Sequence, residues 1–288
     1  MDTKFRAVMM DKYELGKSII IVAHPDDEIL WFSSVMEQVN KIIICFLGSL
    51  RKPDLGPSRK AALDRYPLLN VTCLDINQSD IFGGANWINP TLTDYGIAVP
   101  NRPDSASIYR NNYFEVRQRL AQELLGVSTV FSHNPWGEYG NKEHVQIYRV
   151  VKDLQRELNF KLLFPSYFSN KSSSLMLQNI DRVGSDTIVL KTDIVLATQI
   201  KKIYQECNCW TWYNNWEWLS EDTFIREQGR EDACVPLKEF EVFPLNFIQI
   251  SFVSTEKRVF KNKLVPAITE RLTYIIKKIV TYFRTKTN

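Results

Sequence analysis

The stretch SIIIVAHPDDEILWFSSV, residues 18 to 35, decides the fold. The apolar run from Ile19 is too short for a helix and is typical of a buried strand. The polar sequence HPDDE follows at once, and apolar residues then return at helical spacing from Ile29 to Met36. This pattern predicts a strand, a sharp turn and a helix, with Pro25 at the first helical position. The polar cluster then lies at the carboxyl end of a strand, where open α/β sheets bind their ligands.

The turn itself brings together a histidine and two carboxylates. If His24 caps the helix, Asp27 is three residues further on and lies over the same side of the first turn. One imidazole and one carboxylate can then converge on one point. The neighbouring Asp26 points elsewhere and is free to act as a base, unless it serves only as a helix N-terminal carboxylate stabilised by the helix dipole.

Strands and helices alternate along the rest of the chain. Further strands are expected at residues 41–47, 71–76, 128–132, 161–165 and 186–193, and helices from Ser58 and at residues 108–125, 142–158 and 196–207. This alternation predicts an α/β fold, with a doubly wound, mostly parallel, Rossmann-like sheet and helices on both faces. Residues 242–253 are expected to add strands that cover the sheet edge.

The segment from Ser79 to Ser107 is long and has no convincing periodicity, although it contains Trp87 and Tyr95. A loop of this length inside a compact domain is usually functional or disordered. Because its aromatic residues favour order, we expect a lid or a wall of the substrate site.

The positive charge of the chain is concentrated near its C-terminus. Lys257 to Asn288 contains nine Lys or Arg residues and one Glu, and the rest of the chain is acidic on balance. This distribution argues against a nucleic-acid-binding surface. Apolar residues between Val265 and Phe283 recur at helical spacing and predict an amphipathic basic helix, which either docks on the protein or contacts a membrane peripherally. We expect one α/β domain over residues 1–255 and this extension over residues 256–288.

The composition favours a cytoplasmic protein. No apolar run approaches the length of a membrane-spanning helix, and the first 18 residues lack the apolar core of a signal peptide. The five cysteines have neither redox nor zinc-site spacing and are expected to be reduced thiols. The sequence does not indicate an oligomeric state.

The motif AHPDDE after an apolar strand resembles the signature of the PIG-L/LmbE family of zinc-dependent N-acetylglucosaminyl deacetylases. A second stretch, SHNPWGEYGNKEHVQIYRVV at residues 132–151, is similar to the GHxxH region of that family, and weaker similarity continues at residues 190–204. The resemblance covers residues 17–230. It implies a hydrolase that removes acetyl from an N-acetylated sugar, of the N-acetylglucosamine type, in a glycan or lipid-linked conjugate.

All three histidines of the chain, His24, His133 and His144, lie in these two motifs. We expect His24, Asp27 and His144 to bind Zn²⁺ with a fourth position open to water, as in catalytic zinc sites, although N/O ligands also accept iron or cobalt. Asp26 is then the general base that takes the proton of the attacking water.

The chain departs from the family pattern at Asn141, which replaces the first His of GHxxH. That His is often assigned to acid catalysis or to oxyanion stabilisation. Asn141 can donate a hydrogen bond or cap the following helix, but it cannot deliver a proton at neutral pH. The proton then comes from Asp26 or His133. The alternative is a catalytically degenerate member of the fold that binds a metal or a glycan.

Four further residues are candidates for contact with the substrate. Arg59 either contacts a sugar or a phosphate of the substrate or is a solvated helix residue. Asp80, after the third strand, can hydrogen-bond sugar hydroxyls. Glu138 and Tyr139 either line the pocket or shape the turn. The aromatic residues between Trp210 and Trp218 either pack in the core or stack on a sugar. A nucleotide-binding Rossmann enzyme is excluded, because no G-x-G-x-x-G follows the first strand.

Overall fold

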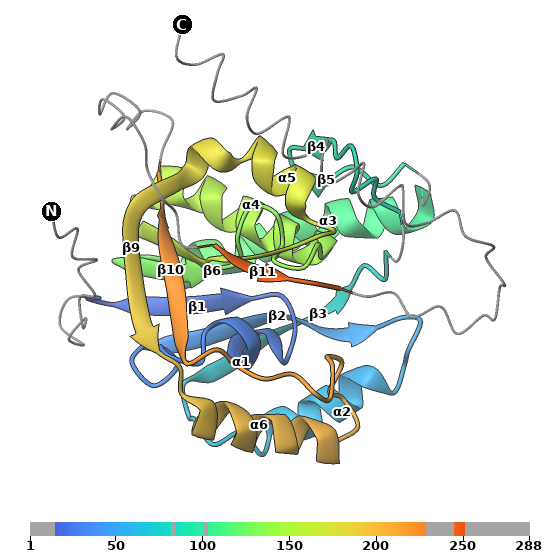
Figure 1. The fold of residues 1–288 in the computed structure, drawn as a ribbon. Coiled ribbons are helices and arrows are strands. Elements are labelled where there is room, and N and C mark those ends of the chain that lie inside the picture. The colour runs from blue at the N-terminus through green and yellow to red at the C-terminus, as the bar shows by residue number, and fades with distance from the viewer. Residues whose placement is uncertain (1–14, 82–83, 101–102, 229–244, 251–288) are drawn as a thin grey trace, which may run out of the picture. The chain divides into compact units, whose positions relative to one another are not determined.

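The central sheet of the protein has seven strands in the order β3-β2-β1-β6-β7-β10-β9 (Figure 1). A computed structural model describes residues 15–81, 84–100, 103–228 and 245–250. The sheet strands are β1 (Ser18–Val22), β2 (Lys41–Ser49), β3 (Val71–Gln78), β6 (Thr129–Ser132), β7 (Lys161–Pro165), β9 (Val183–Lys191) and β10 (Glu221–Glu227). The first five strands of that order from the β3 edge pair in parallel, and β10 runs antiparallel between β7 and β9. The predicted doubly wound, mostly parallel sheet is therefore confirmed.

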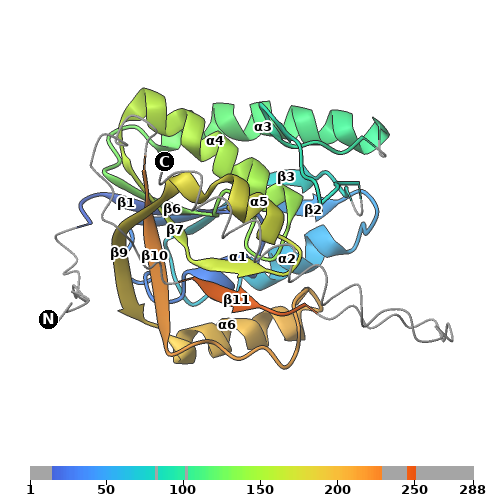
Figure 2. The same cartoon turned by 45° about the horizontal axis from the view of Figure 1, so that its top comes forward.

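Helices cover both faces of this sheet (Figure 2). α1 (Asp27–Trp31), α2 (Leu55–Leu63) and α6 (Ile194–Glu206) lie on one face, and α3 (Pro103–Glu123) and α4 (Lys142–Leu158) lie on the other. Strand β1 explains the arrangement, because its side chains alternate between the faces. Ile20 and Val22 pack in the core that includes residues of α1 and α6, while Ile19 and Ile21 pack in the core of α3 and α4.

The strand order reverses between β1 and β6, which makes their carboxyl ends the switch point of the sheet. The smaller elements are the hairpin β4 (Leu92–Thr93) and β5 (Gly96–Ile97), the pair β8 (Tyr167–Ser169) and β11 (Asn246–Ile248), α5 (Ser173–Gln178) and the 3₁₀ turn η1 (Ile180–Arg182). The hairpin gives regular structure to the predicted lid segment.

The first helix differs from the prediction at both ends. It begins at Asp27 and has five residues, so Pro25 lies outside it and His24 is not its cap. The preceding residue, Asp26, has a φ of 106°, which no helical residue adopts. The expected convergence still occurs, because the Asp27 carboxylate accepts a hydrogen bond from the backbone N–H of His24 at 2.8 Å.

Two other helices begin earlier than predicted. α2 starts at Leu55 rather than at Ser58, and α3 starts at Pro103 rather than at residue 108. The reason is the same in both cases: Pro57 and Pro103 fall within the first helical turn, where a proline N–H would have no helical acceptor.

The C-terminal part of the sheet was predicted least well. β9 begins three residues before the expected strand, and β10 was not predicted. Of residues 242–253, only 245–250 are described, and β11 pairs with β8 in a separate two-stranded sheet rather than covering the edge of the main one.

The predicted basic extension, residues 256–288, lies outside the described residues, so its domain boundary and its membrane contact stay predictions. Among the helices that the structure describes, none is both long and apolar enough to cross a membrane.

Candidate metal centre and active site

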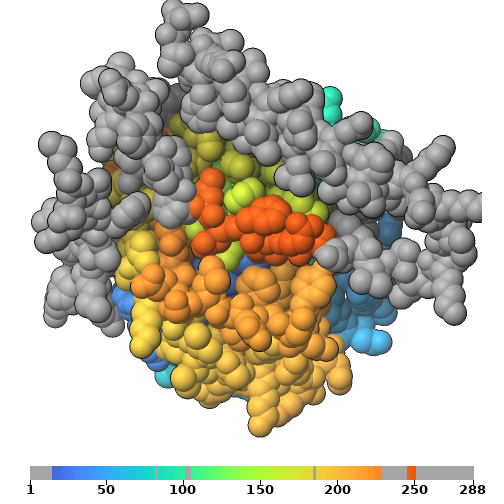
Figure 3. All heavy atoms as spheres, viewed as in Figure 1, coloured from blue at the N-terminus to red at the C-terminus, as the bar shows by residue number. Residues whose placement is uncertain are grey.

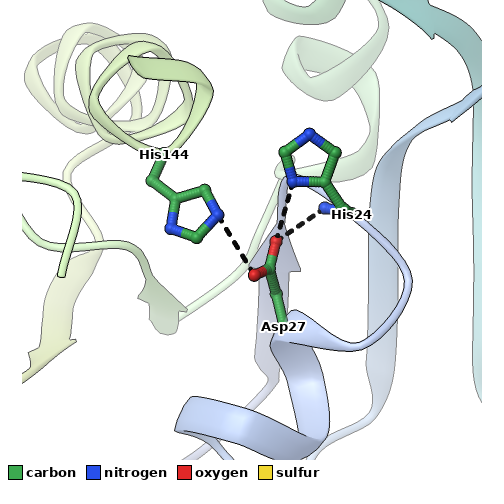
Figure 4. Close-up of side chains that lie close together, drawn as sticks. All are labelled: His24, Asp27 and His144. Atoms are coloured by element: carbon green, nitrogen blue, oxygen red, sulfur yellow. Dashed lines mark hydrogen bonds and ion pairs between the residues drawn. The ribbon is translucent and has the colours of Figure 1, made fainter. Parts of the chain in front are cut away.

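His24, Asp27 and His144 meet at the switch point of the sheet (Figure 4). His24 follows β1, Asp27 opens α1, and His144 lies in the first turn of α4. The Asp27 carboxylate lies between the two rings, with Oδ2 at 3.2 Å from His24 Nδ1 and Oδ1 at 3.1 Å from His144 Nε2. All three side chains are buried. The structure thus brings together the three residues that the sequence predicted as metal ligands.

In both His24 and His144, the ring nitrogen that faces away from Asp27 contacts a second buried carboxylate. Glu143 lies 2.8 Å from His24 Nε2, and Glu138 lies 2.6 Å from His144 Nδ1. Because an ionised carboxylate only accepts hydrogen bonds, these outer ring nitrogens carry the protons. The inner nitrogens, His24 Nδ1 and His144 Nε2, are then the ones left to face Asp27. A carboxylate behind the ring is the usual companion of a histidine that ligates a metal.

The inner face of this cluster fits a small divalent cation. His144 Nε2 is buried and faces Asp27 Oδ1 at 3.1 Å, and it has no other hydrogen-bond or ion-pair partner among the described residues. One ligand atom from each of the three residues lies within 4.8 Å of the others. Two imidazole nitrogens and a carboxylate are a donor set that catalytic zinc accepts. His133, Glu138 and His144 lie equally close together. In that group, however, one oxygen of Glu138 already accepts hydrogen bonds from both rings, which leaves it less suited to bind a metal.

Electrostatics inside the cluster favour a charged Asp27. Burial alone would raise the pKa of Asp27, but His144, His24 and His133 hold it well below its usual value. Burial likewise opposes a charge on His144, yet Asp27 and Glu138 raise the pKa of His144 to about 10. The carboxylates around these rings therefore concentrate negative charge where a cation would bind.

Asp26 lies beside the cluster with one carboxylate oxygen fixed and the other free. Thr211 donates to Oδ2 from its hydroxyl at 2.6 Å and from its backbone N–H at 3.3 Å. No described residue hydrogen-bonds Oδ1. Burial and the adjacent Asp27 raise the pKa of Asp26 to about 6. A carboxylate with this pKa and one free oxygen is suited to general base catalysis.

The strained backbone of Asp26 is supported by Glu28. Glu28 Oε2 accepts the Asp26 N–H at 3.0 Å, while Oε1 accepts from the hydroxyls of Tyr66 and Tyr204 at 2.9 and 2.6 Å. A non-glycine residue at positive φ costs about 1–3 kcal/mol and persists where its surroundings fix it. Glu28 therefore helps to set the direction of the Asp26 side chain.

Tyr139 and Asn141 lie beside the cluster, with the ring of Tyr139 5.3 Å from that of His144. Asn141 caps α4 through Oδ1, which accepts from the backbone N–H of Glu143 at 2.9 Å, and its Nδ2 donates to the Tyr139 hydroxyl at 2.8 Å. Helix capping, one of the two alternatives for Asn141, is thus observed. Since the Tyr139 oxygen accepts from Asn141, its own proton stays available, and burial raises the pKa of Tyr139 well above its usual value.

The remaining predicted residues have structural partners. His133 accepts the Ala23 N–H at Nε2 and lies 3.1 Å from Glu138 at Nδ1, so both of its ring nitrogens are engaged. Asp80 accepts hydrogen bonds from Ser49, Gln78 and the backbone of Arg51, and it is in neither group of candidate metal ligands among the described residues.

Arg59 is 2% exposed, so its description as a solvated helix residue is wrong. It donates to the Leu47 carbonyl and to Gln78, while its Nε is buried without a hydrogen-bond partner among the described residues.

The segment after α6 brings aromatic side chains to the site. Trp212 packs against Tyr139 with ring centroids 4.5 Å apart and against Trp31 at 5.7 Å. Figure 3 shows this segment on the lower part of the visible face, with β11 above it. Packing, one of the two alternatives for the aromatic cluster, is therefore observed for Trp212, which also places this ring beside Tyr139.

Three residues of the site were missed by the sequence analysis: Glu28, Glu143 and Thr211. Glu143 had a local signal, because it directly precedes His144 in a helix start that the prediction already placed near His24. Thr211 had none, since 185 positions separate it from Asp26.

No family model and no curated protein matches the sequence. Among solved structures, the chain is similar to a deacetylase of teicoplanin biosynthesis in complex with teicoplanin, to the zinc-inhibited form of teicoplanin deacetylase Orf2, and to the A40926 pseudoaglycone deacetylase Dbv21. The identities are 14%, 13% and 10%, and the TM-scores are 0.48, 0.48 and 0.45. The matches cover 75%, 74% and 74% of this chain and 99%, 98% and 98% of the others. Function is therefore inferred from the geometry of the site.

Proposed function

We propose that the protein is a zinc-dependent hydrolase that removes the acetyl group from an N-acetylated sugar, of the N-acetylglucosamine type, in a glycan or lipid-linked conjugate. One observation carries the proposal: two histidines, each backed by a buried carboxylate, aim their inner nitrogens at Asp27, and Asp26 lies beside them with a free oxygen. The resemblance of both sequence motifs to the PIG-L/LmbE family supports the same reaction.

The proposed metal site consists of His24, Asp27 and His144. When bound there, zinc would polarise the acetamide carbonyl and lower the pKa of water from about 15.7 to about 7. Glu143 and Glu138 keep the two rings oriented for this role, and His133 acts by positioning Glu138 rather than by proton transfer, because both of its nitrogens are already engaged.

Asp26 moves the protons of the reaction. Its free Oδ1 takes a proton from the water that attacks the acetamide carbon, and Thr211 holds the other oxygen. The protonated carboxyl then returns this proton to the sugar nitrogen as the carbon–nitrogen bond breaks. The products are acetate and the free amine. In this scheme Asp26 replaces the acid that the family pattern places at Asn141.

Tyr139 stabilises the negative charge that develops on the acetamide oxygen. Asn141 orients its hydroxyl by donating to it, which leaves the phenol proton to be donated to the substrate. A donor fixed before the reaction begins lowers the barrier more than one that must reorient. Trp212, packed against Tyr139, supplies an aromatic wall for the sugar.

The test is metal content by mass spectrometry together with acetate release from N-acetylglucosamine conjugates. We expect one equivalent of zinc in the wild type and in Asp26→Asn, with acetate release reduced in the variant by a factor of about 10²–10⁴. Asp186→Asn is the matched control, because this aspartate is exposed and pairs only with Arg226 among the described residues. A wild-type protein without bound metal would refute the proposed site.

A second candidate is a catalytically degenerate member of the fold that binds a metal or a glycan. The observation that favours it is Asn141, whose amide caps α4 and binds Tyr139 and which has no proton to give to the leaving amine. This candidate predicts bound zinc with no acetate release from any member of a broad substrate panel. Acetate release by the wild type that is lost in Asp26→Asn would exclude this candidate.

A further inference from the structure

Tyr204, a residue of α6, is connected to Asp26 through the carboxylate of Glu28. Glu28 Oε2 accepts the backbone N–H of Asp26 at 3.0 Å, and the Tyr204 hydroxyl donates to Glu28 Oε1 at 2.6 Å. Tyr66 donates to the same oxygen at 2.9 Å. Asp26, Glu28 and Tyr204 are buried, so these hydrogen bonds are shielded from water. The hydroxyl of Tyr204 therefore helps to fix Glu28, which in turn holds the backbone of Asp26 at its φ of 106°.

The carbonyl group of Tyr204 reaches Asp26 by a second route, through the end of α6. The last carbonyl groups of a helix have no helical N–H donor. Here the left-handed conformation of Asn208, with a φ of 57°, turns the chain back, and the N–H groups of residues 209 and 210 donate to the Tyr204 carbonyl at 2.9 and 3.2 Å. The next residue, Thr211, donates to Asp26 Oδ2 from its hydroxyl and its backbone N–H. The end of α6 thus places the group that holds the Asp26 carboxylate.

The two routes fix different parts of Asp26, and a general base needs both. One route holds a backbone conformation that is unfavourable for an L-residue unless its surroundings support it. The other holds one carboxylate oxygen and leaves Oδ1 to reach the attacking water, which must lie within hydrogen-bond distance. α1 begins only after Asp26, and α6, on the same face of the sheet (Figure 2), supplies the contacts behind both routes.

We propose that Tyr204 is a positioning residue for the general base Asp26: its hydroxyl acts through Glu28, and its carbonyl acts through the turn to Thr211. The inference rests on the proposed function, in which Asp26 takes the proton of the attacking water, and it adds α6 to the elements that build the site. Among the described residues, no hydrogen bond joins Tyr204 to a proposed metal ligand. Loss of its hydroxyl should therefore misorient the base and leave the metal site in place.

Steady-state kinetics on the full-length, zinc-loaded protein test the hydroxyl route with Tyr204→Phe, which keeps the ring and removes only the hydroxyl. We expect kcat for acetate release to fall on the order of tenfold, with KM and zinc content near their wild-type values. Tyr113→Phe is the matched control, because it also removes a hydroxyl that donates to a carboxylate, that of Asp153, but on the opposite face of the sheet. Its kcat should match that of the wild type.

The Asp26→Asn background separates positioning from a general structural role. In this background Tyr204→Phe should have no further effect on acetate release, because the carboxylate that Tyr204 positions is gone. A further loss as large as the one in the wild-type background would overturn the inference.

Asn208 provides the test of the carbonyl route. Asn208→Val disfavours the left-handed conformation that closes the turn, since β-branched residues rarely adopt it, and should lower kcat. Asn208→Gly adopts this conformation without strain and should restore most of the activity. Equal kcat values in the two variants would overturn the carbonyl route.

Hydrogen exchange measured by NMR gives a readout that does not depend on turnover. Tyr204→Phe should speed exchange of the Asp26 N–H about tenfold and leave that of the Thr211 N–H unchanged, and Asn208→Val should do the reverse. If the wild type releases acetate but neither pattern appears, the positioning role is refuted and the deacetylase stands. If both patterns appear without acetate release from any substrate, the fixing of Asp26 by Tyr204 stands and the proposed function is refuted.

Discussion

Both histidines of the predicted metal site depend on a carboxylate that lies outside the predicted ligand set. Glu143 orients His24, and Glu138 orients His144. Asp26 is fixed in the same way by Thr211. Because these partners are buried and hydrogen-bonded, they determine which ring nitrogen and which carboxylate oxygen face the site. Conservative changes at the partners should therefore alter metal binding or turnover while the ligands stay in place.

Glu143→Gln should weaken zinc binding about 10- to 100-fold, the usual effect of losing such a carboxylate partner. The amide still accepts from His24 Nε2 but lacks the charge that favours a cation. Titration against a competing chelator measures the effect. Glu157→Gln, on the exposed end of the same helix, is the control and should leave the zinc affinity unchanged. Equal affinities in all three proteins would contradict the role of Glu143.

Thr211→Val should lower kcat on the order of tenfold, because one charge-assisted hydrogen bond to Asp26 is lost. KM and zinc content should stay near their wild-type values, and Thr211→Ser should restore most of the activity. Steady-state kinetics on all three proteins provide the measurement. A serine variant as slow as the valine variant would indicate that the methyl group, rather than the hydroxyl, matters.

The three predicted metal ligands were recognisable from sequence because local patterns carry them. His24 and Asp27 are three residues apart after an apolar strand, and His144 begins a strongly periodic helix. Glu28 lay in the first motif, but its role depends on Tyr66 and Tyr204. Such long-range pairings have no periodicity that a sequence could display.

At the scale of elements, β10 joins the parallel strands of the sheet to the edge strand β9. A cluster of charged side chains holds the end of β10 in place. Glu227, at its end, is fully buried and lies 3.0 Å from both Lys152 and Arg182. The Tyr148 hydroxyl lies 2.9 Å from each of its oxygens. One carboxylate thus links β10 to α4 and η1.

Glu227→Gln should lower the free energy of unfolding by about 3 kcal/mol, because it leaves the buried Lys152 and the partly buried Arg182 without their counter-charge. Urea denaturation followed by circular dichroism measures this change. Glu221→Gln, exposed at the start of the same strand, should change stability by less than about 0.5 kcal/mol. Similar small effects for both variants would show that the cluster contributes little.

The elements also show where sequence patterns succeed. α4 was predicted with both ends correct, since its apolar stripe is long and its cap is an asparagine. α1 was predicted too long, because apolar residues continue at helical spacing beyond Trp31 although the helix ends there. The left-handed backbone at Asp26, which delays the start of the helix, likewise leaves no sign in the apolar spacing. β10 was missed because its sequence, EDTFIRE, is mostly charged or polar although five of its seven residues are buried.

At the scale of the whole molecule, Asp222 should make stability depend on pH. It is 1% exposed, and its carboxylate accepts the backbone N–H of Ser34 at 3.1 Å. Burial raises the pKa of Asp222 from 3.8 to about 6, although the hydrogen bond from Ser34 favours the charged form and lowers the pKa. A carboxyl group whose pKa is higher in the folded state destabilises the protein above that pKa, and this penalty disappears as the pH falls towards 4.

Asp222→Asn should therefore raise the free energy of unfolding at pH 8 by up to about 3 kcal/mol, because each pKa unit corresponds to about 1.4 kcal/mol. The gain should shrink between pH 6 and pH 4. Urea denaturation at pH 8, 6 and 4 gives the free energy of unfolding of the variant and of the wild type. The contributions of the other titrating groups cancel in the difference between the two. A variant that is less stable at every pH would refute the assignment.

The sheet order has a consequence for how the protein is made. His24 and Glu143 are 119 residues apart in the chain, yet their side chains meet only when β6 lies against β1. On the ribosome, the first motif emerges long before the helix that completes it, and such distant pairings form late. Newly synthesised chains should therefore bind a metal at the proposed site only after β6 and α4 have joined β1, so metal uptake would report folding of the sheet rather than synthesis of the first motif.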